Sequence, residues 1–286
     1  MTVSIVVPAL ASEAHELPAC LAALVDQRHD DGAVEVFVAQ YGGGPPLRLP
    51  PDVSSSITLI TTHHASPYAA RNLAAAASTG DVLLFTEPVC VAEPGWVAAH
   101  VASLGAPGVT VSVGHVAPAA ITHPLEVFLS YEQVRDAWVF SCGSWRHYFG
   151  RPKNMAVTRD RFQTHGPFAE VARGSDSTFV QRVARERSCD EVVWSPEAVV
   201  RQQTVRDLRS CFRDRFNHSV ALQRHQSSHA APIGFGQRAR LFREAARQRR
   251  YGPVDTMMML ALLGAGIVVF KCGRWRGAAV REGSPS

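Results

Sequence analysis

Polar side chains follow two of the predicted strands, at positions where an α/β sheet can do chemistry. Gln40 follows an apolar strand at 34–38, and Thr86 and Glu87 follow another at 82–85. Ligands of open α/β sheets bind outside the carboxyl ends of the strands. A glutamine amide can donate and accept hydrogen bonds at the edge of a base. A glutamate carboxylate is an oxygen ligand of the kind that Mg²⁺ and Mn²⁺ prefer. The pattern therefore predicts a small-molecule site at this edge.

Two further cations and one carboxylate are of types that could take part in chemistry. Arg71 lies on a helix expected over 66–78, where its guanidinium either meets an anionic ligand or forms a structural ion pair. Arg201 is a second cation that could neutralise an anionic group directly. Asp176 begins a helix expected over 176–186, so its carboxylate either caps that helix or accepts a proton in a reaction.

The elements that must position these residues follow an α/β order. The strands are short and almost continuously apolar, as in a mostly parallel sheet that helices cover on both faces. The chain has 286 residues, of which 46% are apolar and 19% are charged, so it can bury a large core. Expected strands are 3–8, 34–38, 57–61, 82–85, 109–113, 154–157 and 191–194, and expected helices are 12–27 (capped by Ser12), 66–78 (capped by Ser66), 96–103, 124–138, 176–186, 206–224 and 237–250.

Several blocks, taken in order, resemble the family 2 glycosyltransferases. Each block alone is short, but together they cover about residues 3–215. The resemblance implies the GT-A fold: a Rossmann-like α/β/α sandwich with a mostly parallel central sheet, here followed by C-terminal helices at 216–286. The matching blocks are Val3-Ser4-Ile5-Val6-Val7-Pro8-Ala9, Ala69-Ala70-Arg71-Asn72-Leu73-Ala74, Gly80-Asp81-Val82-Leu83-Leu84-Phe85, Glu93-Pro94-Gly95-Trp96, Asn154-Met155-Ala156-Val157, Gly166-Pro167-Phe168 and Gly174-Ser175-Asp176.

The resemblance implies a transferase that moves a sugar from a nucleotide-diphosphate donor to a hydroxyl acceptor, with inversion by direct attack. It places Asp176 at the position of the catalytic base and Arg71 near the base or phosphates of the donor. Asn154 begins the block on the acceptor side. Trp145 lies in a loop where it either stacks on an acceptor sugar or packs. The expected donor-binding residues are Pro8, Ala9, Leu10, Gln40, Arg71, Thr86, Glu87 and Arg201.

The chain departs from the family at the positions that usually hold a metal and read the base. Gln40 stands where an Asp is usual, and Glu87-Pro88-Val89 replaces an Asp-x-Asp motif. Three outcomes stay open: Glu87 and the donor diphosphate hold Mg²⁺ or Mn²⁺ through waters, a cation such as Arg201 replaces the metal, or the domain binds a nucleotide-sugar or a partner without turnover. Because no G-x-G-x-x-G or Walker motif occurs, no organic cofactor is expected.

The C-terminal part is strongly basic. From Arg201 onward there are 16 Lys and Arg against 5 Asp and Glu, whereas residues 1–200 hold 13 against 20. Within it, 257–270 is a 14-residue run without charge, which is short for a membrane span of about 20 residues. Cations and Trp275 follow, so this run either lies on an anionic membrane surface or packs as a closing helix or an oligomer contact.

The location and the partners are predicted from weaker signals. No secretory signal is evident, and six cysteines lack any C-x-x-C pair, so free thiols in the cytoplasm are expected. The charge split suggests a peripheral position on the inner face of the plasma membrane. No nucleic acid is expected, because the Arg-rich helices lack interleaved aromatic residues. The patterns do not indicate an oligomeric state.

Overall fold

The computed structural model describes residues 1–27, 32–171, 173–224 and 231–282. Contacts divide the chain into two compact units, and each is drawn from two separate stretches of sequence. The sheet unit comprises Met1–Ala117 and Tyr148–Gln203, and the helical unit comprises Pro118–His147 and Thr204–Ser286.

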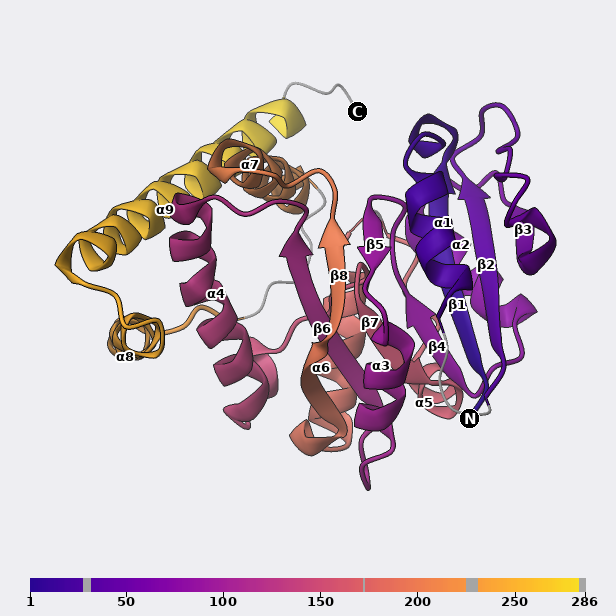
Figure 1. The fold of residues 1–286 in the computed structure, drawn as a ribbon, viewed down its shortest axis with the longest axis horizontal. Helices are drawn as coiled ribbons and strands as arrows, with labels where there is room; N and C mark the ends of the chain where they lie inside the picture. The colour runs from indigo at the N-terminus through magenta and orange to yellow at the C-terminus, as the bar shows by residue number, and fades with distance from the viewer. Residues whose placement is uncertain (28–31, 172, 225–230, 283–286) are drawn as a thin grey trace. The chain divides into compact units, whose positions relative to one another are not determined.

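One sheet of eight strands organises the described part of the sheet unit, in the order β3-β2-β1-β4-β7-β6-β8-β5 (Figure 1). Parallel pairing joins β1 to β2 and β4, and β2 to β3. Antiparallel pairing joins β7 to β4 and β6, and β5 to β8. The bounds are β1 (Val3–Leu10), β2 (Val34–Tyr41), β3 (Ile57–Thr61), β4 (Val82–Phe85), β5 (Cys90–Ala92), β6 (Val111–Pro118), β7 (Met155–Thr158) and β8 (Val192–Gln202).

Helices cover both faces of this sheet, because alternate strand residues point to opposite sides. On one face, α1 (Leu17–Val25) and α3 (Trp96–Leu104) bury apolar side chains against Val82 and Leu84 of β4. On the other face, Phe85 packs against aromatic rings carried by or next to α5 (Arg159–His165) and α6 (Ser175–Glu186), and α2 (Pro67–Ala77) adds Tyr68. The predicted α/β/α sandwich is confirmed.

Local structure differs from the prediction at the start of α1. The helix begins at Leu17, and Ala11–Glu13 form a separate 3-10 helix, so Ser12 is not its cap. The Glu13 carboxylate instead turns back to accept a hydrogen bond from the Leu10 backbone N–H at 2.8 Å. By contrast, Ser66 caps α2 as predicted, because its hydroxyl accepts a hydrogen bond from the Tyr68 N–H at 3.1 Å.

Several elements were underestimated or missed by the sequence patterns. The strand expected at 191–194 is β8, which continues to Gln202 and pairs with the unpredicted strand β5. Helix α5 follows β7 directly and was not predicted. Pro196 lies inside β8 and is exposed, and proline usually marks the end of a strand. This proline explains why the apolar pattern predicted a strand that ended at residue 194.

The helical unit contains α4 (His123–Ser141), α7 (Leu208–Arg224), α8 (Phe235–Gln248) and α9 (Pro253–Glu282). Val127 of α4, Ala245 of α8 and Met259 of α9 form a buried apolar cluster. Glu132 of α4 accepts a hydrogen bond from Arg215 of α7 at 2.9 Å. The boundary expected between 215 and 216 falls inside α7, and α4 packs with the later helices.

Helix α9 is longer than the 14-residue apolar run at 257–270 suggested. It covers 30 residues, because the helix continues through the cations that follow Phe270. Among the described residues, it is the one helix whose length and composition suffice to cross a membrane, and 11% of its most apolar window is buried. The expectation that this element is too short is therefore wrong. The six cysteines are free thiols, as predicted.

Candidate active site

The carboxyl ends of β1, β2 and β4 meet at one edge of the sheet. The parallel register aligns Ala9 of β1 with Gln40 of β2 and Val6 of β1 with Phe85 of β4. Glu87 follows β4 by two residues and therefore emerges beside the end of β1. The strand order alone brings these predicted residues together, since consecutive βα units deliver their strand ends to the same edge.

The residues at the carboxyl end of β1 are largely buried. Pro8 and Ala9 are buried within the strand, and Leu10 is half-buried. Burial raises the pKa of the Glu13 carboxyl, the Leu10 N–H lowers it, and the nearby Glu87 raises it further. A Cβ on Gly42 would stand 2.7 Å from a Leu10 methyl carbon. The loop after β2 therefore needs glycine there to lie against β1.

Gln40 is not turned toward an open ligand position. Its side chain is buried, with 2% of the residue exposed. The amide nitrogen donates to the Pro45 carbonyl at 2.8 Å, and the amide oxygen accepts from the Leu47 N–H at 2.8 Å. Both ends of the amide therefore hold the loop after β2. Gln40 shapes the edge of the expected base site instead of presenting its amide to a base.

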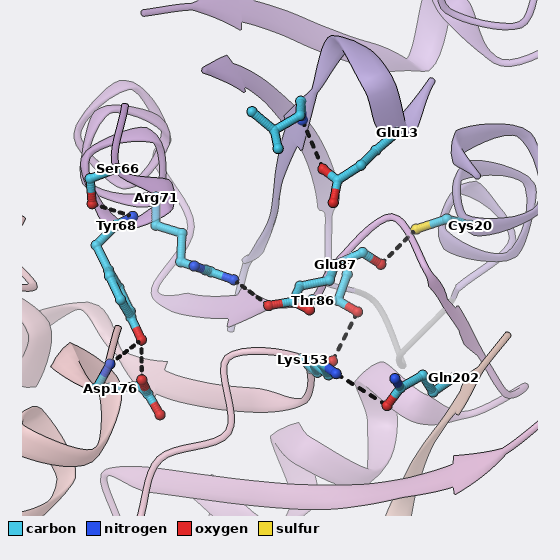
Figure 2. Close-up of polar contacts among 12 residues, drawn as sticks. Glu13, Cys20, Ser66, Tyr68, Arg71, Thr86, Glu87, Lys153, Asp176 and Gln202 are labelled. Carbon is cyan, nitrogen blue, oxygen red and sulfur yellow. Dashed lines mark hydrogen bonds and ion pairs between the residues drawn. The ribbon is translucent and has the colours of Figure 1, made fainter. Parts of the chain in front are cut away.

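Arg71 and Glu87 form an ion pair at the sheet edge (Figure 2). Arg71 is 1% exposed, and its Nη2 donates to Glu87 Oε1 at 3.1 Å. The same guanidinium lies over the Tyr68 ring, 5.3 Å from its centroid. Within the described residues, Arg71 Nε is buried and has no hydrogen-bond partner. A buried donor without a partner is costly, so the charge of Arg71 is only partly compensated at the sheet edge.

Asp176 stands on the second position of α6 and joins the same network. Gly174, with φ 87°, occupies the N-cap, so Asp176 does not cap the helix. Its Oδ1 accepts a hydrogen bond from the Tyr68 hydroxyl, and its Oδ2 accepts one from Ser177 at 3.3 Å. Burial raises the pKa of Asp176, while the Tyr68 hydrogen bond and the Arg71 charge lower it. A buried carboxylate with a raised pKa is suited to general-base catalysis.

Lys153 is a site residue that sequence reasoning missed. Its backbone carbonyl accepts a hydrogen bond from the Thr86 hydroxyl at 3.0 Å, next to Glu87. Its ammonium donates to Gln202 Oε1 at 3.1 Å (Figure 2). One signal was available in the sequence: the chain has only two lysines among 29 Lys and Arg, and one of them lies two residues before the start of β7. Lys153 thus places a second cation near the sheet edge.

Arg201 does not join this cluster. It lies on β8, where its Nε contacts Glu93 Oε1 at 2.5 Å, and half of its side chain is exposed. The ion pair links β8 to the segment after β5 rather than to Glu87. The donor-binding role of Arg201 stays a prediction.

Asn154 has a structural environment instead of an open acceptor site. It is fully buried, and its amide makes four hydrogen bonds. Asn154 Oδ1 accepts from Trp96 Nε1 at 2.7 Å and pairs with His100 Nε2 at 2.8 Å. Its Nδ2 donates to the carbonyls of His115 and Ala198, both at 2.7 Å. These bonds use the whole amide and hold the core together, and the acceptor role of Asn154 stays a prediction.

His100 extends this buried network. Its Nδ1 lies 2.7 Å from the Ser112 hydroxyl, which lies 2.6 Å from the Ser195 hydroxyl. Desolvation by burial lowers the pKa of His100 to about 4. The imidazole is therefore neutral at pH 7 and serves the packing of α3 on the sheet. Trp145 belongs to the helical unit, where Arg146 lies over its ring, and its acceptor role stays a prediction.

The residues at the sheet edge do not fit a protein-built site for a divalent cation. Among the described residues, no group of three or more His, Cys, Asp or Glu side chains could hold a metal ion. One Glu87 oxygen is engaged by Arg71, and Glu13 is turned onto Leu10. A fixed guanidinium beside the single available carboxylate opposes a second cation at that position. This donor set is poorer than hard cations normally require.

No protein-family model and no curated protein sequence matches the chain. Solved structures do match it. A mannosyltransferase from Pyrobaculum calidifontis, in complex with GDP-Man and Mn²⁺, has a TM-score of 0.60 at 17% identity, covering 96% of this chain and 84% of that chain. Glucosyl-3-phosphoglycerate synthase from Mycobacterium tuberculosis, in complex with phosphoglyceric acid, has a TM-score of 0.54 at 17% identity, covering 80% of this chain and 81% of that chain.

The same Mycobacterium enzyme, in complex with Mn²⁺, UDP-Glc and phosphoglyceric acid, has a TM-score of 0.52 at 16% identity and covers 82% of this chain. At such identities the likeness establishes the fold. The chain therefore has the GT-A fold of nucleotide-sugar glycosyltransferases, which confirms the fold that the sequence blocks implied.

Proposed function

We propose that the chain is a glycosyltransferase that moves a sugar from a nucleotide-diphosphate donor to a hydroxyl acceptor. The observation that carries this proposal is the connected cluster of Arg71, Tyr68 and Asp176 at the carboxyl edge of a GT-A sheet. The cluster combines a buried cation with a partnerless donor and a buried carboxylate with a raised pKa. These are the two groups that the reaction needs: one for the leaving diphosphate and one for the acceptor proton.

In the proposed reaction, the acceptor hydroxyl oxygen attacks the anomeric carbon of the donor sugar. The bond from that carbon to the diphosphate oxygen breaks, and its electron pair leaves with the nucleoside diphosphate. The acceptor proton passes to the Asp176 carboxylate. Direct attack inverts the anomeric centre. The Tyr68 hydroxyl holds one Asp176 oxygen in place, so that the carboxylate enters the reaction already oriented.

We propose that Arg71 and Lys153 neutralise the leaving diphosphate. Arg71 has a buried Nε without a partner, and the backbone of Lys153 binds the Thr86 hydroxyl while its ammonium donates to Gln202. The neighbouring structures hold Mn²⁺, but the donor set of this chain supports a reaction that does not depend on a metal bound by the protein. Pro8, Ala9 and Leu10 would then line the nucleotide, and Glu87 would hold Arg71 in position.

We also propose that the enzyme works on the cytoplasmic face of a membrane, with a lipid-linked, envelope or natural-product acceptor. The basic charge after Arg201 and the exposed apolar helix α9 support this location. The neighbouring structures hold phosphoglyceric acid or glycerol 3-phosphate. Both compounds therefore belong in the panel of acceptors to be tested.

The test is donor turnover by the purified full chain. UDP-sugars and GDP-sugars are supplied one at a time, with Mn²⁺ or with a chelator, and release of the nucleoside diphosphate is measured. We expect turnover of at least one donor that survives the chelator, and its loss in Asp176→Asn. Ser177→Ala is the matched control, because it keeps the Asp176 carboxylate and removes a neighbouring hydroxyl, which donates to Asp176 at 3.3 Å and accepts from the Gly150 N–H at 3.1 Å.

Two results would count against the proposal. Thermal stabilisation by a nucleotide-sugar without turnover of any donor would indicate a binding domain without activity. Turnover that disappears with the chelator would contradict the metal-independent step while leaving the transfer activity in place.

A further inference from the structure

Helix α9 carries an apolar face that nothing in the described helical unit covers. Half of the large apolar residues that the described chain exposes are on this helix. The exposed fractions are 78% for Val254, 72% for Met257, 63% for Leu260, 48% for Ile267, 59% for Val268 and 78% for Trp275. Soluble proteins rarely leave a continuous apolar patch of this kind in water.

The opposite face of α9 is fixed by close packing. Gly266, Gly273 and Gly277 are buried at intervals of seven and four residues, which places them on one side of the helix. A Cβ on Gly277 would stand 2.6 Å from the Val220 carbonyl oxygen of α7, and one on Gly273 would overlap the Ser219 hydroxyl. Figure 1 shows α7 and α9 side by side. Helix α7 therefore packs against the glycine side of α9 and leaves the apolar face of α9 uncovered.

The packing of α9 argues against a transmembrane orientation. A helix of 30 residues is about 45 Å long and could cross a hydrocarbon core of about 30 Å. If α9 crossed, however, its packed neighbours would enter the hydrocarbon with it. Arg215 of α7 lies against Gly266 and binds Glu132 of α4, which also binds Arg135. Charged groups at that depth are strongly disfavoured.

The charges on α9 match an anionic lipid surface. Lys271, Arg274 and Arg276 follow the apolar face within one and a half turns, and Trp275 lies among them. No acidic residue occurs between Asp255 and Glu282 in the sequence. Cations near a membrane surface bind anionic headgroups, and tryptophan prefers the interface between headgroups and acyl chains.

We propose that α9 lies in the plane of an anionic lipid bilayer, with its exposed apolar face in the headgroup–acyl boundary and Lys271 and Arg276 on lipid phosphates. This orientation keeps the ionic groups of α4 and α7 out of the hydrocarbon. The proposal rests on the membrane location proposed above but not on the donor or the chemistry. It makes the helical unit a monotopic anchor.

The experiment is flotation of the purified full chain with vesicles of phosphatidylcholine alone or of phosphatidylcholine with phosphatidylglycerol. We expect binding to the anionic vesicles and weaker binding to the neutral ones, with release in high salt. Met257→Glu and Val268→Glu, each alone, should lower binding by about tenfold or more, because each puts a charge where the proposed orientation places an exposed apolar side chain in the bilayer. Leu59→Glu is the matched control: it changes an exposed apolar residue of β3 and should leave binding unchanged.

Further outcomes separate location from orientation. Absence of wild-type binding to anionic vesicles overturns both. Binding by the wild type that Met257→Glu and Val268→Glu leave unchanged overturns the role of α9. Retention of the chain in cell membranes after alkaline carbonate extraction leaves the location standing but overturns the in-plane orientation. A dimer in light scattering that Met257→Glu dissociates, without vesicle binding, assigns the face to a second copy instead. Circular dichroism melting confirms that the variants are folded.

Discussion

Acidification should destabilise the sheet unit through one buried histidine, His100. The ring is fully buried between Asn154 and Ser112, and desolvation lowers its pKa from 6.5 to about 4. Between these two pKa values, the unfolded chain binds a proton that the folded chain does not. Stability from the neutral ring is therefore fully present above pH 6.5 and is lost as the pH falls toward 4.

The magnitude follows from the size of the shift. One pKa unit corresponds to about 1.4 kcal/mol, so the shift of His100 corresponds to about 3 kcal/mol over the whole range. Between pH 7 and pH 5 alone, the expected loss of unfolding free energy is about 2 kcal/mol. A loss of that size is a large part of the stability of an ordinary domain.

The assay is urea unfolding at pH 7 and pH 5, followed by tryptophan fluorescence. His100→Gln should be less stable than the wild type at pH 7, but its loss between pH 7 and pH 5 should be smaller by about 2 kcal/mol. His15→Gln, at an exposed histidine, reports the contribution of the surface. An equal pH dependence in the wild type and in His100→Gln would refute the reasoning, because no proton would then be linked to this ring.

Three shorter predictions concern the site. Asn154→Ala should lower the unfolding free energy by about 2–6 kcal/mol, because the buried nitrogens of Trp96 and His100 lose their acceptor. A variant with normal stability and a raised KM for the acceptor would instead support the acceptor role of Asn154. Tyr68→Phe removes a hydrogen bond that lowers the pKa of Asp176. The acidic limb of its pH–rate profile should therefore move to higher pH, and an unmoved limb would exclude Asp176 as the base. Lys153→Gln should lower the rate of donor turnover by about a hundredfold. Arg185→Gln, which changes an exposed cation, should leave that rate unchanged. If Lys153→Gln turns over the donor as fast as the wild type, Lys153 does not belong to the site.

Much of the sheet could be predicted because its strands are short apolar runs buried on both faces. The runs at 57–61 and 82–85 match β3 and β4 to the residue. Strand β5 could not be predicted, because three residues carry no periodic pattern and its pairing with β8 is a long-range contact. The start of α1 was wrong because Ser12 and Glu13 satisfy a local turn instead of a helix cap.

The sequence could predict which residues lie near the sheet edge, because backbone position decides that. It could not predict which partners their side chains bind. Arg71 and Glu87 were expected from the order of the elements and Asp176 from the family resemblance, and Tyr68 connects Arg71 to Asp176 in the structure. The uses of Gln40 and Asn154 could not be foreseen, because sequence does not show which backbone atoms surround an amide. Lys153 was missed for the same reason, although its rarity among the cations was visible.

The discontinuous helical unit affects how deletions of this gene product should be interpreted. Helix α4 belongs to that unit, although it precedes part of the sheet unit in the chain. A truncation after Gln203 removes α7, α8 and α9 but leaves α4 behind, with Val127 and Phe128 stripped of the partners that bury them. Such a deletion would misfold and aggregate. Its phenotype would report a damaged fold, and only surface substitutions on α9 separate anchoring from folding.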